Sequence, residues 1–422
     1  MLLLALAAPS DAKTLANGLS LTTLQVPGDV VTVALVLEGG TAADGRDHGE
    51  SLLAHTLFFG QGDDFLRESF RKELLEQGAR LDVDVRPDNV IVSITGLASQ
   101  LEQIVGLLAI ATIPVDLVDR DFQRARNAIV DGLWELRRSS VRRAVAQIPE
   151  LVFGGAHPYG HLPSGDRRTL GRLSVAKIKA HLGRTLCPSR ARLVVSGDVT
   201  MPKVERLVAE DFSSWKRCRK PVEAPGVAFE PLKRFEVRGV HDGHRTQVTI
   251  VAGLAVPLSR PEDVPALEMA VDVLGGSLSS RLQSNLRQRD GLTYGASAAV
   301  DVRRGAGVVY VHTPVDAKRV DEALRSLIDT FDGLAASPFT GEELERARRR
   351  RSSHRASAAR STELRIRRWL TGSDAAEPSD DDVRRVAAAM KSDALQIVVV
   401  GSRRKLTPQL EAMKLGRVRF VR

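Results

Sequence analysis

The chain is organised around the sequence His48-Gly49-Glu50-Ser51-Leu52-Leu53-Ala54-His55-Thr56-Leu57-Phe58-Phe59-Gly60. A strand-like apolar run and a turn come before it. Asp47 is placed to cap a helix at this point, and Glu50, three residues later, can reach back toward the cap. We therefore predict a helix that begins directly after Asp47.

This helix resembles the zinc helix of the inverted zinc metalloproteases, the family of pitrilysin, insulin-degrading enzyme and mitochondrial processing peptidase. The family's helix carries H-x-x-E-H, then an aromatic residue and a glycine. When His55, Phe58 and Gly60 are aligned, Ser51 stands at the first His and Ala54 at the general-base Glu. In relatives the two His clasp the ion and the Glu activates its water. The resemblance therefore implies a zinc-protease helix that has lost its zinc chemistry.

The third metal ligand of this family, a Glu on a later helix, is missing as well. Residues 125–132 resemble that helix, with Gly132 at the ligand position and Ala125 at an earlier Glu of the pattern. Asp131 points about 100° away from the required direction, and Glu135 is displaced by about 60° around the helix. The single imidazole of His55 cannot hold zinc. We expect no cofactor in this chain.

Length and charge limit the classes of protein to consider. With 422 residues, 43% of them hydrophobic, the chain can fill two or more folded domains. Much of its net charge of +9 is arginine on helical faces with few aromatic residues between them, which is weak support for a nucleic acid ligand. The two cysteines, Cys187 and Cys218, make no disulfide framework and are expected to be free or to form one bridge at most. No apolar run approaches the ~20 residues that span a bilayer.

Residues 1–14 read as a shortened export signal or a tail. Residues 1–12 contain a short apolar core and small-x-small cleavage sites, but no basic residues precede that core. We expect a periplasmic or otherwise exported protein on this basis. The alternative is an uncleaved tail on a cytoplasmic protein.

The rest of the chain divides into two halves, residues 15–216 and residues 236–422. The segment between them, residues 217–235, is polar and contains several prolines, as an interdomain linker does. Features of the first half recur in the second: the strand starting at Gln247 matches the one at Val31, Gly291 matches Gly78, and 397–401 matches 193–197, at offsets of 216, 213 and 204 residues. These offsets indicate an internal duplication. We expect an α+β fold of two homologous halves, each a mainly antiparallel sheet covered by helices, which together form a half-clam as in the family.

Two histidines outside the zinc helix, His157 and His161, invite a second metal interpretation. Residues 153–160 resemble the family's loop that ends in H-P-Y-G, and His161 follows directly. A Pro and a Gly between His157 and His161 disfavour a helix that would align them, so a turn-stabilising histidine is the preferred interpretation. His48 and His55 would stand ~10 Å apart, too far to share an ion.

The second half keeps a motif that the family uses to bind substrate. Residues 274–282, Leu-Gly-Gly-Ser-Leu-Ser-Ser-Arg-Leu, resemble its glycine turn and the helix after it, and the family's Arg/Tyr pair falls on Arg287 and Tyr294. In relatives this pair donates hydrogen bonds to substrate carbonyl oxygens and to the oxyanion. The resemblance assigns substrate binding to Arg287 and Tyr294. The alternative is that Arg287 suits the negative end of its helix and Tyr294 packs beneath it.

Some bacterial members of the family are heterodimers in which one chain has H-x-x-E-H and the other has the Arg/Tyr pair without zinc. This chain resembles the second kind. The resemblance therefore implies a catalytically inactive subunit of a zinc metallopeptidase. It would supply Arg287 and Tyr294 to the active site of a zinc-bearing homologous partner that cleaves peptides. The alternative is a structural or scaffold member of the family with no peptidase role.

An arginine-rich segment raises nucleic acid binding as a third possibility. Residues 346–351 contain five arginines, and Arg365, Arg367 and Arg368 follow. Acidic residues stand beside the first cluster at helical spacing, at positions 342, 343 and 345. A solvated, partly ion-paired helix face explains this pattern better, so we expect no nucleic acid partner.

Overall fold

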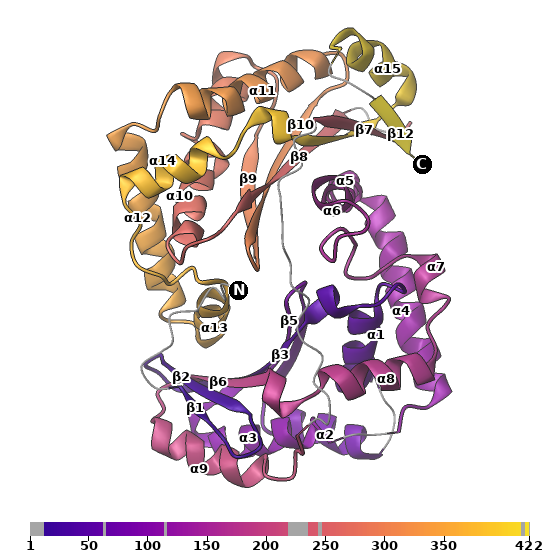
Figure 1. Ribbon diagram of the computed structural model, residues 1–422, viewed down its shortest axis with the longest axis vertical. Coiled ribbons are helices and arrows are strands. Elements are labelled where there is room, and N and C mark those ends of the chain that lie inside the picture. The colour runs from indigo at the N-terminus through magenta and orange to yellow at the C-terminus, as the bar shows by residue number, and fades with distance from the viewer. Residues whose placement is uncertain are drawn as a thin grey trace.

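The computed structural model describes residues 12–61, 65–113, 116–217, 235–243, 247–414 and 418–421. Two α+β halves lie one above the other, each with helices covering the outer face of a twisted sheet (Figure 1). The predicted fold class is confirmed. Most of the predicted linker and most of the predicted signal or tail lie outside the described residues.

The N-terminal half is built on a six-stranded sheet in the order β1-β2-β6-β3-β5-β4. Its strands are β1 Lys13–Thr14, β2 Ser20–Gln25, β3 Val30–Glu38, β4 Arg80–Val85, β5 Asn89–Leu97 and β6 Ala191–Gly197. Neighbours are antiparallel, except that β2 and β6 are parallel. The seven residues between the ends of β3 are all buried, which is why this strand reads as a nearly continuous apolar run.

The C-terminal half repeats this sheet in the order β12-β7-β11-β8-β10-β9. Its strands are β7 Glu236–His241, β8 Gln247–Pro257, β9 Ser297–Arg303, β10 Ala306–Asp316, β11 Gln396–Gly401 and β12 Val418–Val421. Strands β7, β11, β8, β10 and β9 occupy the places of β2, β6, β3, β5 and β4. The sixth strand differs, because β1 is antiparallel to its neighbour and β12 is parallel to its own. The strand order supports the predicted duplication.

Helices connect the strands in both halves. In the N-terminal half they are α1 Glu50–Thr56, α2 Phe65–Glu76, α3 Leu101–Ile110, α4 Asp119–Arg138, α5 Ser140–Val145, α6 Ile148–Phe153, α7 Arg167–Leu170, α8 Val175–Thr185 and α9 Met201–Asp211. In the C-terminal half they are α10 Asp263–Gly275, α11 Val320–Ala336, α12 Gly341–Ala358, α13 Thr362–Thr371, α14 Asp380–Ala388 and α15 Arg403–Ala412. Wider π-helical turns form η2 Leu57–Gln61 and η5 Gln283–Arg289, and short 3₁₀ turns form η1 Gly40–Ala43, η3 Ala98–Gln100, η4 Pro188–Arg190 and η6 Ser392–Ala394.

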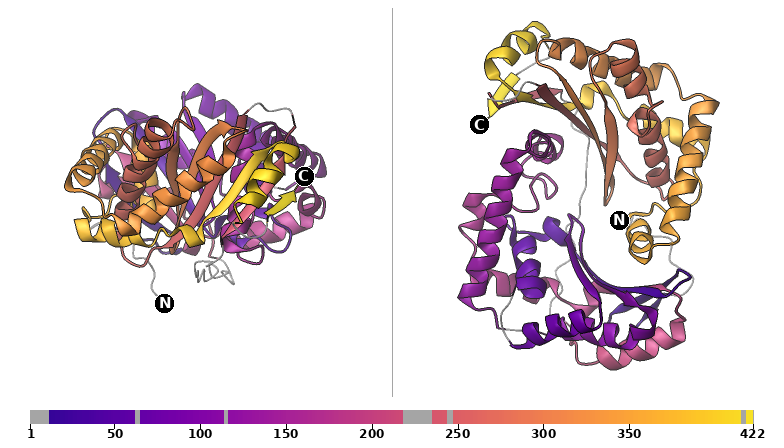
Figure 2. Two further views of the ribbon diagram at one scale, coloured as in Figure 1. Left: turned by 90° about the horizontal axis from the view of Figure 1, so that it is seen from above. Right: turned by 180° about the vertical axis from the view of Figure 1, so that it is seen from behind.

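Each half covers the second face of its sheet with helices from the other half. Helices α5 and α6 pack on the C-terminal sheet, where Ile148 and Leu151 join Val251 and Val398 in one buried cluster. Helix α13 packs on the N-terminal sheet, where its apolar side chains join those of β3, β5 and β6. The view from behind also shows α5 and α6 under the upper half (Figure 2). Both halves therefore depend on each other for their cores.

A polar contact joins the tip of the β4–β5 hairpin in the N-terminal half to the tip of the β9–β10 hairpin in the C-terminal half. Asp88, in the turn between β4 and β5, accepts the hydroxyl of buried Tyr159 through Oδ1 and the backbone N–H of Arg304 through Oδ2, at 2.7 Å for the latter. Arg303 donates to the carbonyl oxygen of Tyr159 at 3.1 Å and lies over the rings of Phe153 and Tyr159. The H-P-Y-G loop thus joins the two halves.

Cys187 is disulfide-bonded, which agrees with the predicted alternative of one disulfide bridge. The other cysteine, Cys218, lies outside the described residues. Within the described part of the chain, no helix is both long enough and apolar enough to cross a membrane.

Replacing Tyr159 by phenylalanine tests the contact between the hairpin tips. Tyr159→Phe removes one donor from the half-buried Asp88 carboxylate, so the free energy of unfolding should fall by about 1–3 kcal/mol in urea titrations. Tyr294→Phe is the matched control, because the side chain of Tyr294 is 85% exposed and its hydroxyl should contribute nothing measurable. Equal stabilities of the two variants would contradict this role for Tyr159.

Candidate functional site

The start of α1 differs from the prediction. Asp44, not Asp47, accepts the backbone N–H groups of Gly49 and Ser51, each at 2.8 Å. Gly49 has a φ of 96°, a left-handed conformation that turns these N–H groups toward Asp44. Asp47 forms an ion pair with Lys177 instead. A helix does form in this stretch, but it begins at Glu50 and not directly after Asp47, and the predicted capping residue was wrong because the turn before the helix could not be derived from spacing.

Ser51 takes part in a buried hydrogen-bond network where a zinc ligand stands in relatives. Its hydroxyl donates to the carbonyl oxygen of Gly40 at 2.6 Å and lies 3.2 Å from Nε2 of His181. Nδ1 of His181 lies 3.3 Å from Oε2 of Glu50. The side chains of Ser51 and His181 are almost completely buried. The vacated position is therefore closed by hydrogen bonds between α1 and α8.

Burial and hydrogen bonding oppose each other at Glu50. Burial by itself would raise the pKa of this carboxyl, but hydrogen bonds from His181 and from the backbone N–H of Gly45 outweigh it, so its pKa lies below the usual value. Sequence reasoning missed both Glu50 in this role and His181. The two residues stand 131 positions apart, and no local pattern connects them.

His55 is the one zinc-ligand residue of the pattern that remains, and it is buried and neutral. Its Nδ1 lies 2.7 Å from the carbonyl oxygen of Ser51, so this nitrogen carries the proton and donates. Burial, and then the nearby His181, lower its pKa to about 3. Its Nε2 has no hydrogen-bond partner within the described residues. One free nitrogen is thus available at the place where relatives bring three donors together.

The other metal positions offer no donor either. Ala54 is part of the apolar core. Gly132 is exposed on α4, and a Cβ placed on it would meet nothing within 4 Å. Asp131 is exposed, and Glu135 pairs with Arg138 at 3.0 Å. In the described ranges, no three His, Cys, Asp or Glu side chains are arranged to hold a metal ion. The residues at this site do not fit a catalytic zinc.

In the C-terminal half, ion pairs join α10 and α12. Helices α10 and α12 correspond to α1 and α4 by their order along the chain. Arg351 of α12, with 6% of its surface exposed, lies 3.2 Å from Glu268 of α10, and Arg350 lies 2.9 Å from Asp272. Burial raises the pKa of both carboxyls, against the pull of the neighbouring arginines. Ion pairs therefore tie the two helices that carry metal ligands in the other half of relatives.

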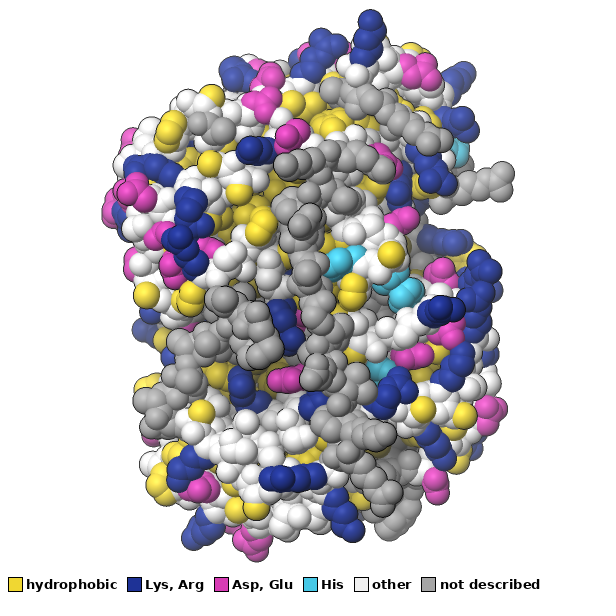
Figure 3. All heavy atoms as spheres, in the orientation of Figure 1, with side chains coloured by type: hydrophobic (Ala, Val, Ile, Leu, Met, Phe, Trp, Pro, Cys, Tyr) yellow, Lys and Arg dark blue, Asp and Glu magenta, His cyan; other side chains and the backbone are white. Residues whose placement is uncertain are grey.

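The predicted ion pairing of the arginine-rich helix agrees with these contacts. Arg346 pairs with Glu342, Arg349 with Glu345 and Arg348 with Asp380. On the face seen in Figure 3, acidic and basic side chains are interspersed. Arg351 differs from the expectation, since it is buried and not solvated.

Arg287 and Tyr294 are both exposed. The side chain of Tyr294 is 85% exposed, so the alternative in which it packs beneath Arg287 is wrong. Arg287 makes no ion pair or hydrogen bond with any described side chain. Both side chains are therefore available to a ligand.

The backbone around Tyr294 is held firmly. Thr293 donates to the carbonyl oxygen of Pro314 at 2.6 Å, and Thr313 donates to that of Gly295 at 3.2 Å. Gln283 of η5 donates to the carbonyl oxygen of Ala296 at 2.9 Å. The loop thus has bonds to β10 and to η5 on both sides of an exposed phenol ring.

A glycine turn sets the end of the helix that carries Arg287. Gly291 has a φ of 59°, the same as Gly78 at the matching place in the first half. The backbone N–H of Leu292 donates to the carbonyl oxygen of Leu286 at 2.8 Å, one residue further back than in a Schellman turn, because η5 is a wider π-helical turn. Arg319 donates to the carbonyl oxygens of Asp290 and Gly291. The turn directs the chain from η5 into the strand after Tyr294.

The remaining histidines have structural contacts. Nδ1 of His157 accepts the backbone N–H of Tyr159 at 3.0 Å, so the predicted turn-stabilising role is confirmed. The ring of His161 stacks on that of His48, with 3.3 Å between centroids.

The buried neutral His55 should make stability depend on pH. Its pKa of about 3 when folded lies below the ordinary histidine value of 6.5, so between these values the unfolded chain binds more protons and stability falls as pH falls. His55→Leu should remove up to about 1.4 kcal/mol per pH unit of this slope in urea titrations from pH 7.5 to 5. His354→Gln, at an exposed histidine, should leave the slope unchanged. Identical slopes for wild type and His55→Leu would contradict the buried, neutral state.

Comparisons with known proteins agree with these features. The family profile described as "Peptidase M16 inactive domain" matches residues 172–351. An uncharacterized zinc protease of Mycobacterium tuberculosis is 26% identical over 253 residues, which are 58% of this chain and 56% of that protein. The matched region thus spans little more than half the length of that relative.

Solved structures share the fold over nearly the whole chain. A protease from Helicobacter pylori superimposes with a TM-score of 0.81 at 18% identity, covering 93% of this chain and 99% of the other. A peptidase M16 inactive domain from Pseudomonas fluorescens gives a TM-score of 0.78 at 18% identity, covering 93% and 97%. These findings support the resemblance to the pitrilysin family that the sequence motifs carry: residues 172–351 match a domain profile of the M16 peptidases, and the chain shares its fold with a solved M16 inactive domain.

Proposed function

We propose that the chain is the non-zinc subunit of a heterodimeric M16 peptidase. A zinc-bearing homologous subunit would hold the metal and activate the water, and this chain would bind the peptide. The proposal rests on one combination of features in the same molecule. The zinc positions Ser51, Ala54 and Gly132 offer no ligand, while Arg287 and Tyr294 stand exposed.

The anchoring of the Tyr294 loop supports a binding role. An exposed tyrosine on a loose loop would lose side-chain and backbone freedom on binding, and that loss would weaken the contact. Here the backbone is already fixed by hydrogen bonds to Pro314 and from Thr313 and Gln283. A ligand would have to order little more than the side chain itself, which favours a preorganised hydrogen-bond donor.

The chemistry of the pair suits a peptide. The phenol and the guanidinium are hydrogen-bond donors, and an extended peptide presents carbonyl oxygens along its length. A donor aimed at an oxygen that gains negative charge during the reaction lowers the barrier more than it strengthens substrate binding. Arg287 and Tyr294 would therefore act on the carbonyl group that the partner's site attacks, or on one beside it.

Metal analysis tests the first half of the proposal. The purified chain, dialysed against micromolar zinc and then against buffer, should retain no stoichiometric zinc by mass spectrometry, because one histidine nitrogen cannot hold the ion. It should also cleave no peptide by itself. One tightly held zinc per chain would contradict the proposal, whatever the activity of the preparation.

Reconstitution with a zinc-bearing relative tests the second half. Co-expression with an M16 chain that contains an intact H-x-x-E-H should give peptidase activity. Arg287→Ala or Tyr294→Phe should then lower turnover by about 10²-fold, the usual effect of losing an oxyanion donor.

A neighbouring arginine provides the matched control for this experiment. Arg289→Ala should have little effect on turnover, because Arg289 is also exposed but its guanidinium is paired with Asp290. If an assembled and active complex tolerates Arg287→Ala and Tyr294→Phe without loss, the chain acts as a scaffold member of the family instead.

A further inference from the structure

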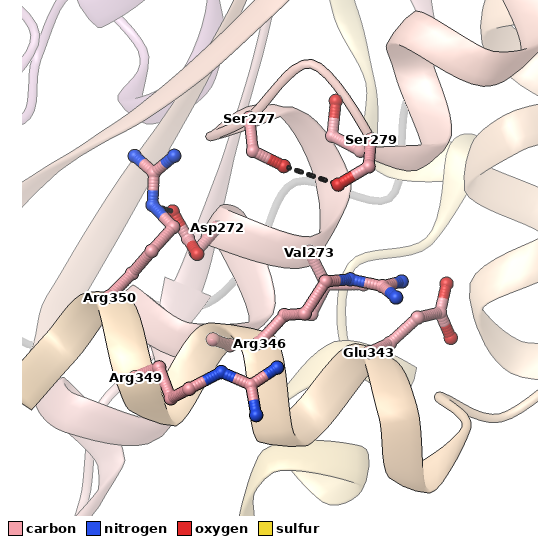
Figure 4. A pocket seen from close by; sticks show the side chains of 10 residues that line it. Asp272, Val273, Ser277, Ser279, Glu343, Arg346, Arg349 and Arg350 are labelled. Carbon is pink, nitrogen blue, oxygen red and sulfur yellow. Dashed lines mark hydrogen bonds and ion pairs between the residues drawn. The ribbon is translucent and has the colours of Figure 1, made fainter.

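A cavity of about 230 Å³ lies between the end of α10, the loop after it and one face of α12. The loop contributes Ser277, Ser279 and Ser280, and α12 contributes Arg346, Arg349 and Arg350. Figure 4 shows Ser277 and Ser279 on one side of this space, with Arg350 and Arg346 reaching past it from the helix. This cavity is separate from the positions of Ser51 and His55 in the other half.

Two acidic side chains also border the cavity, and each has an arginine partner. Glu343 accepts two hydrogen bonds from Arg281, at 2.8 and 2.9 Å, and one from the backbone N–H of Thr340 at 2.8 Å. Asp272 pairs with Arg350 at 2.9 Å. Neither carboxylate is left to attract a cation.

The cavity has many more free donors than acceptors. Arg346 and Arg349 each use one nitrogen for a glutamate four residues earlier on the exposed side of α12, and such surface pairs are weak. A guanidinium has five N–H donors, so most of theirs remain. Ser277 and Ser279 lie 3.3 Å apart and share one hydrogen, which leaves the other hydroxyl free to donate.

The backbone of the loop adds further donors. Among the described residues, the N–H groups of Ser277, Leu278 and Ser279 have no backbone or side-chain acceptor. The side chain of Leu278 is 72% exposed, so it does not fill the cavity. The cavity therefore combines guanidinium, hydroxyl and amide donors, and the two carboxylates at its border are each paired with an arginine.

We infer that this cavity binds an oxyanion, the carboxylate or phosphate group of a small ligand or of a peptide. Guanidinium groups make short, charge-assisted hydrogen bonds with such groups, and two of them can hold both oxygens at once. The inference is independent of the function proposed for Arg287 and Tyr294. The cavity is nevertheless connected to Arg287 along the chain, because the loop of Ser277, Ser279 and Ser280 leads directly into the helix that carries Arg287.

Calorimetric titration of the full chain tests the inference with two defined probes at constant ionic strength. One is inorganic phosphate, and the other is a short peptide with a free C-terminal carboxylate, compared with its C-terminal amide. We expect saturable binding of one anion per chain. The double variant Arg346→Gln/Arg349→Gln should weaken it at least about tenfold, the usual effect of losing a charge-assisted hydrogen bond.

Two further variants keep the result interpretable. Arg355→Gln changes a partly exposed arginine of the same helix that pairs with Glu377 and does not line the cavity, so binding should be unchanged. Ser279→Asp places a negative charge in the enclosure and should abolish binding. Phosphate binding alone would assign the site to small anions, and preference for the free carboxylate over the amide would assign it to peptides. No saturable binding of either probe, or equal losses in Arg355→Gln and the double variant, would overturn the inference.

Discussion

The carboxylate of Asp88 is the contact on which the arrangement of the molecule depends. It accepts one hydrogen bond from the H-P-Y-G loop of its own half and one from the backbone of the other half. Asp88 and Arg304 stand 216 residues apart, which is also an offset of the duplication. The turns of two equivalent hairpins therefore meet each other, at the place where the two halves face one another. Asp88 is half-buried at this junction, so its carboxylate loses part of its contact with water and depends on these donors.

This junction is connected to α1, the helix that resembles the zinc helix of the family. The carbonyl oxygen of Gly40 accepts the hydroxyl of Ser51, and the backbone N–H of Thr41 donates to Arg86 in the turn that holds Asp88. Gly40 has a φ of 42°, and a Cβ at this position would lie 2.0 Å from the carbonyl oxygen of Arg86. Only glycine allows the two segments to approach so closely. The hydroxyl of Ser51 thus helps to hold the Gly40 turn, which contacts the hairpin that carries Asp88.

Polar contacts join neighbouring helices in both halves, but the contacts differ. In the N-terminal half, hydrogen bonds among Ser51, His181 and Glu50 join α1 to α8. In the C-terminal half, the ion pairs of Arg351 and Arg350 with Glu268 and Asp272 join α12 to α10. Polar groups that remain in a protein interior have to be paired, and either solution satisfies them. The exchange of α5, α6 and α13 then makes the halves inseparable, because each sheet would expose an apolar face without the other half.

The sequence by itself determined the elements, the duplication and the missing ligands. Strand periodicity, the glycine ends at Gly78 and Gly291, and the residues at Ser51, Ala54 and Gly132 are local features, and local spacing is enough to interpret them. The tertiary structure decided which groups meet across the fold. Asp44 took the capping role expected of Asp47, His181 reached Ser51 across 130 residues, and Tyr294 turned out exposed. These outcomes depend on how segments far apart in the sequence pack against each other. Residue spacing along the chain describes only local structure, so it cannot give the distances between such segments.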